Sequence, residues 1–333
     1  MDRFCDLGDF SKDELLALLK LAGRLERKPE PRALQGKVLA LLFLSPSLRT
    51  LTSFQSAMVR LGGSSFVVSP EMSIHRLEYQ NGIVMDGVAA EHIREAVPVI
   101  ASYGHAMGLR VPAERHSLEQ DIADRQFREL AALVDVPLIN MESAVNHPCQ
   151  GLADWKTLDD LGVPGKGGRF VLSWVYHPEP LPYSVPASVL HVAATRGMDV
   201  VVLRPPGFEL PDSIVNKARE AAQRAGGSII ETSDRQEAMQ GAHVIYAKSW
   251  ASASKYENRR AEEGLRREYM KWCVAENWFE HARPDCRFMH CLPVRRGVEV
   301  DDGVLDGPRN AVIKEARNRM LVQMAVLYHM LRS

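Results

Sequence analysis

The stretch Lys37-Val38-Leu39-Ala40-Leu41-Leu42-Phe43-Leu44 is an apolar run of strand length that leads directly into Ser45-Pro46-Ser47-Leu48-Arg49-Thr50. Such a run predicts a strand buried on both faces. Phe54, Met58 and Leu61 then follow at helical spacing up to a glycine pair, so a helix begins within the polar segment. Hydroxyl groups, Arg49 and free helical N–H groups therefore meet at a strand end, which favours binding of phosphate. A capped helix followed by a surface arginine would give the same pattern, so both interpretations stay open.

The composition is that of an ordinary globular protein. With 333 residues the chain is long enough for two domains. A net charge of −1 without a basic run argues against nucleic-acid binding. No apolar segment reaches membrane-spanning length, and the acidic start is unlike a signal peptide. Five scattered cysteines without a CxxC pair fit a reducing compartment, so we expect a cytoplasmic protein.

Strand-like and helix-like segments alternate along the chain. This alternation predicts an α/β fold with two doubly wound parallel-sheet domains. We expect residues 1–145 to form the first domain and 146–316 the second, with a final helix at about 317–333 packing back on the first. The polar segment 69–92 is expected to be a long loop. The further strands are predicted at 65–68, 107–111, 136–142, 170–174, 198–203, 228–232 and 243–247, and helices at 93–101, 117–133, 148–158, 185–196, 212–225 and 315–331.

Polar side chains recur where the predicted strands end. Ligands of open parallel sheets bind at the carboxyl ends of the strands. Agreement among six such positions therefore predicts an active site in the cleft between the two halves. These positions are Ser47/Arg49, Arg110, Glu142/His147, His177, Lys248 and His290.

Several familiar sites are missing from the sequence. There is no GxGxxG turn after a strand, no nucleotide P-loop, no HExxH, no Cys/His pair at zinc spacing and no GxSxG elbow, so we predict no metal and no cofactor. Arg49 and Arg110 remain to hold a phosphate, while His147 can donate to a carbonyl oxygen as negative charge develops. Gln150 lies one helical turn beyond His147. Each residue taken singly also has a structural interpretation: a backbone-bonded histidine, a solvated amide or a surface ion pair.

Three ordered motifs resemble those of the aspartate/ornithine carbamoyltransferases: Ser47-Leu48-Arg49-Thr50, His147-Pro148-Cys149-Gln150 and His290-Cys291-Leu292-Pro293. The resemblance extends to Glu315-Ala316-x-Asn318-Arg319. It implies direct attack of an amine on carbamoyl phosphate in arginine biosynthesis, and a homotrimer with sites at subunit interfaces. It also implies Arg110, His147 and Cys291 as catalytic residues. Carbamoyl phosphate would be held by Ser47, Leu48 (backbone), Arg49, Thr50, His75, Arg110, His147, Gln150, Leu292 and Arg319.

The acceptor branch is indicated by the loop Trp174–Pro182. It resembles the proline-rich loop of enzymes that act on Nα-acylated ornithine, and the Ser-Met-Gly loop of ornithine transcarbamylases is absent. An acylated nitrogen carries no charge, so the site needs a cation for the α-carboxylate, such as Lys248, but no acid for an ammonium. The resemblance implies acceptor binding by Glu142, His177, Lys248, Cys291, Arg295 and Ala90.

Ala90 bears on the acyl group. Acetylornithine enzymes resemble this chain but place a glutamate there, which would repel a succinyl carboxylate. Alanine leaves room for it, and Arg295 or Arg296 is expected to meet that carboxylate. We therefore expect N-succinylornithine as acceptor, with N-acetylornithine or ornithine as alternatives and a non-catalytic phosphate-binding homologue as another class. The chain departs from the family pattern at Leu51 (usually arginine), His75 (usually tryptophan) and Glu179 (usually basic).

Overall fold

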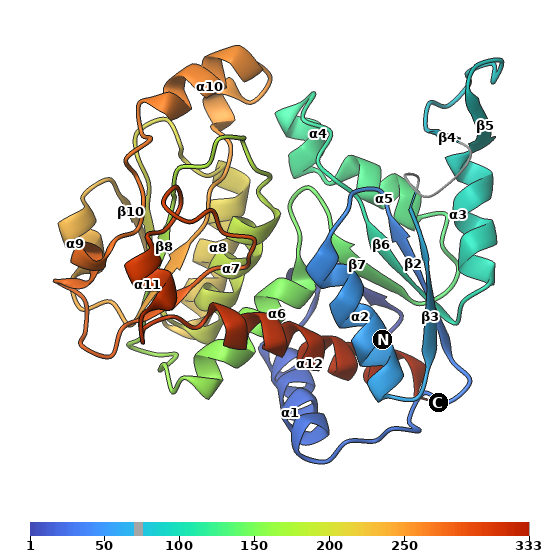
Figure 1. The fold of residues 1–333 in the computed structure, drawn as a ribbon, viewed down its shortest axis with the longest axis horizontal. Coiled ribbons are helices and arrows are strands. Elements are labelled where there is room, and N and C mark those ends of the chain that lie inside the picture. Colours follow the sequence, from blue (N-terminus) through green and yellow to red (C-terminus); the bar gives the residue numbers. More distant parts are fainter. Residues whose placement is uncertain (70–75, 333) are drawn as a thin grey trace.

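The computed structural model describes residues 1–69 and 76–332, in which two parallel five-stranded sheets each form the centre of one half of the molecule (Figure 1). The predicted fold class is confirmed. The first sheet has the order β1-β7-β6-β2-β3 and the second β10-β9-β8-β11-β12. The strands are β1 (Arg3–Phe4), β2 (Val38–Phe43), β3 (Ser64–Val68), β6 (Ala106–Arg110), β7 (Leu138–Glu142), β8 (Arg169–Ser173), β9 (Asp199–Leu203), β10 (Ser228–Thr232), β11 (Val244–Ala247) and β12 (Arg287–Met289).

Each sheet reverses its strand order once. In the first sheet the chain goes from β2 outward to β3 and then continues on the other side at β6. In the second sheet it goes from β8 through β9 to β10 and then returns to β11 beside β8. The helices that follow neighbouring strands diverge at such a point and leave a crevice at the carboxyl ends of the strands. Each half therefore offers a binding crevice, between β2 and β6 and between β8 and β11.

Helices surround both sheets (Figure 1). A capping box opens the first helix, because Ser11 N–H donates to Glu14 Oε2 at 2.7 Å and Glu14 N–H donates to Ser11 Oγ at 3.3 Å. Among the described residues, no helix is both long and apolar enough to cross a membrane. The helices are α1 (Lys12–Arg27), α2 (Leu48–Arg60), α3 (Ile93–Ser102), α4 (Leu118–Ile122), α5 (Arg125–Ala131), α6 (Pro148–Asp160), α7 (Ser184–Arg196), α8 (Asp212–Ala225), α9 (Arg235–Met239), α10 (Arg259–Arg267), α11 (Asp302–Asp306) and α12 (Val312–Leu331), with 3-10 segments η1 (Leu7–Asp9), η3 (Ala253–Lys255) and η4 (Glu276–Phe279).

The single helix expected over 117–133 is wrong, because α4 and α5 are separated at Asp124. This residue adopts φ 53° and is buried. Its carboxylate accepts hydrogen bonds from Ser143 Oγ, Ala144 N–H and Asn146 Nδ2. Aspartate tolerates left-handed backbone better than most residues. The break thereby anchors the loop that leads to His147.

Two helices join the halves. α12 packs against α1, α2 and α6 and runs from the second half to the first (Figure 1). α6 contributes Leu152 and Trp155 to the core of the first half and Leu158 to that of the second. The domain boundaries at 145 and 316 remain predictions.

The segment 76–92 differs from the predicted loop. Here β4 (Arg76–Glu78) pairs in parallel with β5 (Ala89–His92), and this small sheet projects from the first half beside α3 (Figure 1). Val84 and Val88 are 77% and 78% exposed. Alternating hydrophobicity is weak in these short strands, which is why their sequence did not predict them.

Candidate active site

A cavity of about 220 Å³ lies where the crevices of the two halves face each other. Its walls contain residues that follow β2, β6, β7, β8, β11 and β12, so the predicted gathering of strand ends is found. Ten predicted site residues line it: Ser47, Arg49, Arg110, Glu142, His147, His177, Lys248, Cys291, Leu292 and Arg319.

The anion end of the cavity is the start of α2. Ser47 caps this helix, because its Oγ accepts from Thr50 N–H at 3.4 Å, and the same hydroxyl donates to Thr50 Oγ1 at 2.9 Å. The side chain of Leu48 is 73% exposed, so only its backbone N–H can serve a ligand in the cavity. Arg49 Nε and Arg319 Nε are buried and have no hydrogen-bond partner among the described residues. Unsatisfied buried guanidinium donors beside a helix N-terminus form a strong site for an anion.

Arg110 and Glu142 form an ion pair at the ends of β6 and β7. Arg110 Nε also donates to Ser45 Oγ at 3.2 Å, and Ser184 Oγ donates to Glu142 Oε1 at 2.7 Å. Burial raises the pKa of Glu142, but Arg110 and His147 outweigh it and hold the pKa at about 2. Glu142 is therefore ionised, and it fixes the orientation of the Arg110 guanidinium.

His147 occupies the N-cap position of α6, and its N–H donates to Ser188 Oγ at 2.8 Å. Its Nε2 lies 3.7 Å from Glu142 Oε2, while Nδ1 has no hydrogen-bond partner within residues 1–69 and 76–332. Burial lowers the pKa of His147; Glu142 opposes this, Arg319 and Arg110 add to it, and the result is about 3. The ring is therefore neutral near pH 7, and it can donate an N–H to a carbonyl oxygen without bringing a positive charge.

Two residues predicted to hold carbamoyl phosphate lie behind the cavity wall. Thr50 is fully buried, and Gln150 is 1% exposed. Gln150 Oε1 accepts a hydrogen bond from Arg319 Nη1 at 3.2 Å. In this geometry Gln150 acts through Arg319.

The other end of the cavity contains Lys248 and His177. Lys248 is buried and lines the cavity. His177 Nε2 accepts from Arg295 Nε at 3.0 Å, so Arg295 lies at the cavity's edge without lining it. Arg296 is turned away and pairs with Asp302 and Asp306.

Cys291 and Leu292 line the middle of the cavity. Burial raises the pKa of the Cys291 thiol to about 11, although Lys248 opposes this. Cys291 is therefore a neutral thiol near pH 7, which argues against a role as a proton acceptor. His290 is fully buried, accepts from Leu292 N–H at 2.9 Å and does not line the cavity.

Not every predicted residue is brought to this cavity. Ala90 lies on β5, exposed, and does not line it. His75 lies outside the described residues. Leu51 packs against the core of the first half, and Glu179 pairs with Arg259 at 3.2 Å.

Five further residues line the cavity although their sequence did not single them out: Leu181, Pro182, Ser184, Val185 and Pro293. The proline-rich loop was recognised, but its apolar members carry no chemical signal of their own. Ser184 opens a helix and looks like an ordinary capping residue. Only the hydrogen bond from Ser184 to Glu142 shows that this serine belongs to the site.

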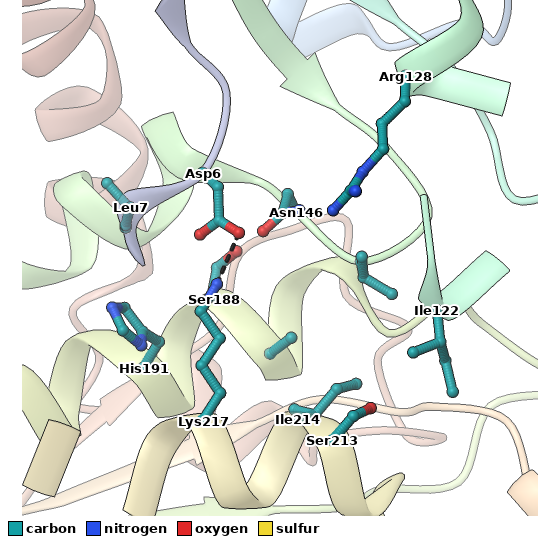
Figure 2. A pocket seen from close by; sticks show the side chains of 12 residues that line it. Asp6, Leu7, Ile122, Arg128, Asn146, Ser188, His191, Ser213, Ile214 and Lys217 are labelled. Carbon is teal, nitrogen blue, oxygen red and sulfur yellow. Dashed lines mark hydrogen bonds and ion pairs between the residues drawn. The ribbon is translucent and has the colours of Figure 1, made fainter. Parts of the chain in front are cut away.

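A second cavity, of about 210 Å³, lies between the halves and is lined by none of the predicted site residues (Figure 2). Lys217 of α8 forms an ion pair there with Asp6, at 2.6 Å. The segment before α6 contributes Asn146 to this cavity and His147 to the active-site cavity. No group of three or more His, Cys, Asp or Glu suited to a metal ion occurs among the described residues.

Comparison with known proteins gives the family. The description "Aspartate/ornithine carbamoyltransferase, carbamoyl-P binding domain" matches residues 3–160, and the family's "Asp/Orn binding domain" matches residues 183–330. N-acetylornithine carbamoyltransferase of Xanthomonas campestris is 37% identical over 98% of this chain and 97% of its own. N-succinylornithine carbamoyltransferase of Bacteroides thetaiotaomicron is 32% identical over 88% and 87%.

The solved structures agree. A structure of acetylornithine transcarbamylase complexed with acetylcitrulline superposes with a TM-score of 0.93 at 36% identity, covering 99% of both chains. A glutamate-to-alanine variant of N-acetyl-L-ornithine transcarbamylase, complexed with carbamyl phosphate and N-succinyl-L-norvaline, has the same TM-score and identity and covers 99% of this chain and 100% of that one. The chain therefore belongs to the aspartate/ornithine carbamoyltransferase family and is a carbamoyltransferase.

Proposed function

We propose that this enzyme transfers the carbamoyl group of carbamoyl phosphate to the δ-amine of N-succinyl-L-ornithine, giving N-succinyl-L-citrulline and phosphate in arginine biosynthesis. Residues 1–145, with the final helix, would bind carbamoyl phosphate, and residues 146–316 the acceptor. The enzyme works in the cytoplasm, without metal or cofactor.

The observation that carries an N-acylated acceptor is the charge of the cavity. Arg49, Arg110, Lys248 and Arg319 line it against the one carboxylate of Glu142, which leaves an excess of three positive charges. Carbamoyl phosphate as a dianion and one α-carboxylate would balance this excess. Free ornithine would add an α-ammonium, but Glu142 is already engaged by Arg110 and Ser184. An acylated nitrogen avoids that conflict.

The reaction is a direct displacement. The neutral δ-amine adds to the carbamoyl carbon, the C–O bond to phosphate breaks as the tetrahedral intermediate collapses, and the departing phosphate takes up the proton that the amine loses. Arg110 and His147 donate to the oxygen that becomes negative, and the hydroxyl of Thr50 supports this end of the site. Such donors bind the transition state more strongly than the substrate.

The choice of succinyl depends on Ala90. The resemblance places it where acetylornithine enzymes have a glutamate. Solved variants of one such enzyme, with a glutamate replaced by alanine, proline, serine or valine, are complexed with N-succinyl-L-norvaline. A succinyl group adds a fourth negative charge, and Arg295 is a cation at the cavity's edge. N-acetylornithine is the second candidate, favoured by the 37% identity to an enzyme of that name.

The test is carbamoyl transfer to N-succinylornithine, N-acetylornithine, ornithine and aspartate, measured in parallel. We expect the highest kcat/KM with the succinyl compound. A preference for acetylornithine would overturn the assignment to Ala90 and keep the N-acylornithine class. Absence of transfer to every acceptor would support a phosphate-binding homologue.

Ala90→Glu should lower kcat/KM for N-succinylornithine about tenfold or more relative to N-acetylornithine, because a glutamate that meets the acyl group repels the succinyl carboxylate. Ala89→Glu, at the neighbouring position of β5 that pairs with Arg76, is the control. If the ratio of kcat/KM for the two acceptors is unchanged in Ala90→Glu but changed in Glu91→Ala, then Glu91 rather than Ala90 determines the acyl preference.

A homotrimer is part of the same proposal. Ala90 lies on the projecting segment and away from its own cavity, so it can meet an acceptor only in the site of a neighbouring subunit. The exposed Val84 and Val88 are apolar surface suited to such a contact. Light scattering should give the mass of three chains, and Val84→Asp with Val88→Asp should reduce it. A monomer at micromolar concentration would contradict the arrangement.

A further inference from the structure

Two carboxyl groups meet behind the anion end of the cavity. Asp154 of α6 and Glu315 of α12 are each 1% exposed. Gln150 Nε2 donates to Asp154 Oδ1 and to Glu315 Oε1, in both cases at 2.8 Å. Because both oxygens bind one nitrogen, they cannot lie further apart than twice that distance. The two acids are therefore neighbours in a buried site, and their side chains are hydrogen-bonded to each other.

The hydrogen bonds show which acid carries a proton. Glu315 Oε1 also accepts from Tyr246 OH at 3.2 Å, and its Oε2 accepts from His290 N–H at 3.0 Å, so both of its oxygens face donors. Asp154 Oδ2 faces no donor among the described residues. Two carboxylates in contact do not both ionise in a buried site. The proton belongs on Asp154 Oδ2, from which it is donated to Glu315.

We propose that this protonated Asp154–Glu315 pair positions the anion site. It holds the Gln150 amide so that Oε1 receives Arg319, and it holds the backbone N–H of His290 at the start of the segment that carries Cys291. With one proton the pair has a single negative charge, and it lies behind the cavity wall rather than among the groups that line the cavity. The inference rests on the proposed function, because it explains how that site is kept in order.

The arrangement makes the site sensitive to alkaline pH. The charged or titratable groups that face the pair are Arg319 on α12, Tyr246 on β11 and Cys291 after β12. Burial and Glu315 raise the pKa of Asp154, and burial raises that of Glu315 to about 7. Loss of the proton leaves two adjacent negative charges that draw Arg319 back and repel phosphate.

The effect on stability has the same sign. The folded protein keeps a proton that the unfolded chain releases near pH 4. The contribution to stability is therefore complete below that pH and is lost as the pH rises through the folded value. Both phosphate affinity and stability should fall toward alkaline pH.

The test uses the full-length protein and inorganic phosphate, titrated calorimetrically between pH 7.5 and about 9.5, where phosphate is a dianion. Asp154→Asn supplies a permanent N–H donor in place of the protonated Oδ2. At pH 7.5 the phosphate affinity of this variant should lie within about threefold of that of wild type. It should stay constant as the pH rises, while the phosphate affinity of wild type falls several-fold. Glu315→Gln places an NH₂ group opposite the N–H and O–H groups that donate to Glu315. It should weaken phosphate binding about tenfold or more over the whole pH range. The matched control, Asp159→Asn on the same helix, should follow wild type.

Two results would overturn the proposal. In the first, Asp154→Asn weakens phosphate binding as much as Glu315→Gln does. In the second, the phosphate affinity of Asp154→Asn falls with rising pH as steeply as that of wild type. If Glu315→Gln does not fold, the melting temperatures of wild type and Asp154→Asn still test the proposal. The melting temperature of Asp154→Asn should rise relative to that of wild type as the pH increases. Phosphate binding needs no acceptor. Failure of carbamoyl transfer would therefore count against the proposed function and leave this test intact.

Discussion

The anion end of the cavity is made of side chains that leave strand ends and helix starts, whereas the acceptor end is made of loops. Arg110, His147 and Arg319 are held by β6 and by the starts or interior of α6 and α12. His177 and Arg295 belong to loops after β8 and β12, and Ala90 belongs to a segment that projects from the molecule. From this difference we expect anion binding to depend on rigid elements and acceptor choice to depend on loops.

The largest effect should come from the anion end. Arg49→Ala removes a buried guanidinium whose Nε has no other partner among the described residues. We expect kcat/KM for carbamoyl phosphate to fall about 10²- to 10³-fold, the usual loss for one transition-state donor. Arg60→Ala, at the exposed end of the same helix, should leave it unchanged. Equal kinetics in both variants would mean that α2 does not hold the phosphate.

An intermediate effect should separate the two ends. Lys248→Met removes the buried ammonium at the acceptor end, and we expect the acceptor KM to rise about 10- to 100-fold because its α-carboxylate is left unpaired. The affinity for inorganic phosphate should change little. Lys255→Met, on the exposed η3 segment, is the control. A similar loss of phosphate affinity in Lys248→Met would show that the two ends are not independent.

The smallest effect should come from Arg295, and it tests the preference for a succinyl over an acetyl group. Arg295→Ala should raise KM for N-succinylornithine about 3- to 10-fold and leave N-acetylornithine unaffected, because only the succinyl carboxylate needs this cation. Arg296→Ala should stay within about twofold for both acceptors, since its ion pairs are exposed and contribute little. Equal effects on both acceptors in Arg295→Ala would assign the residue to the His177 loop rather than to the succinyl group.

The sequence predicts the anion end well because its chemistry is local. Ser47, Arg49 and Thr50 are neighbours along one strand-to-helix junction, and their spacing alone brings them together. His147 and Gln150 share one helical turn. Eight strands of the two sheets are also evident from apolar runs, whereas β1 and β12 are too short to give a pattern.

Other predictions failed for identifiable reasons. The break at Asp124 depends on Ser143 and Asn146, which are distant in sequence, so the helical pattern over 117–133 gave no sign of it. The surface ion pair considered for Arg110 is excluded only by burial, because the side chains of Arg110 and Glu142 are 14% and 16% exposed. The pKa of Cys291 depends on burial, which no motif reveals.

By itself the sequence determined the doubly wound fold and the family, because those follow from periodicity and from motifs within a few residues, and it supplied the residues that we propose to meet the phosphate. Only the tertiary structure decided that Gln150 stands behind Arg319 and that Arg295 rather than Arg296 lies at the cavity's edge. It also brought together Asp154 and Glu315, for which we propose a shared proton. Those relations join residues up to 169 positions apart. Distance, burial and hydrogen-bond direction arise only when α6 and α12 pack together.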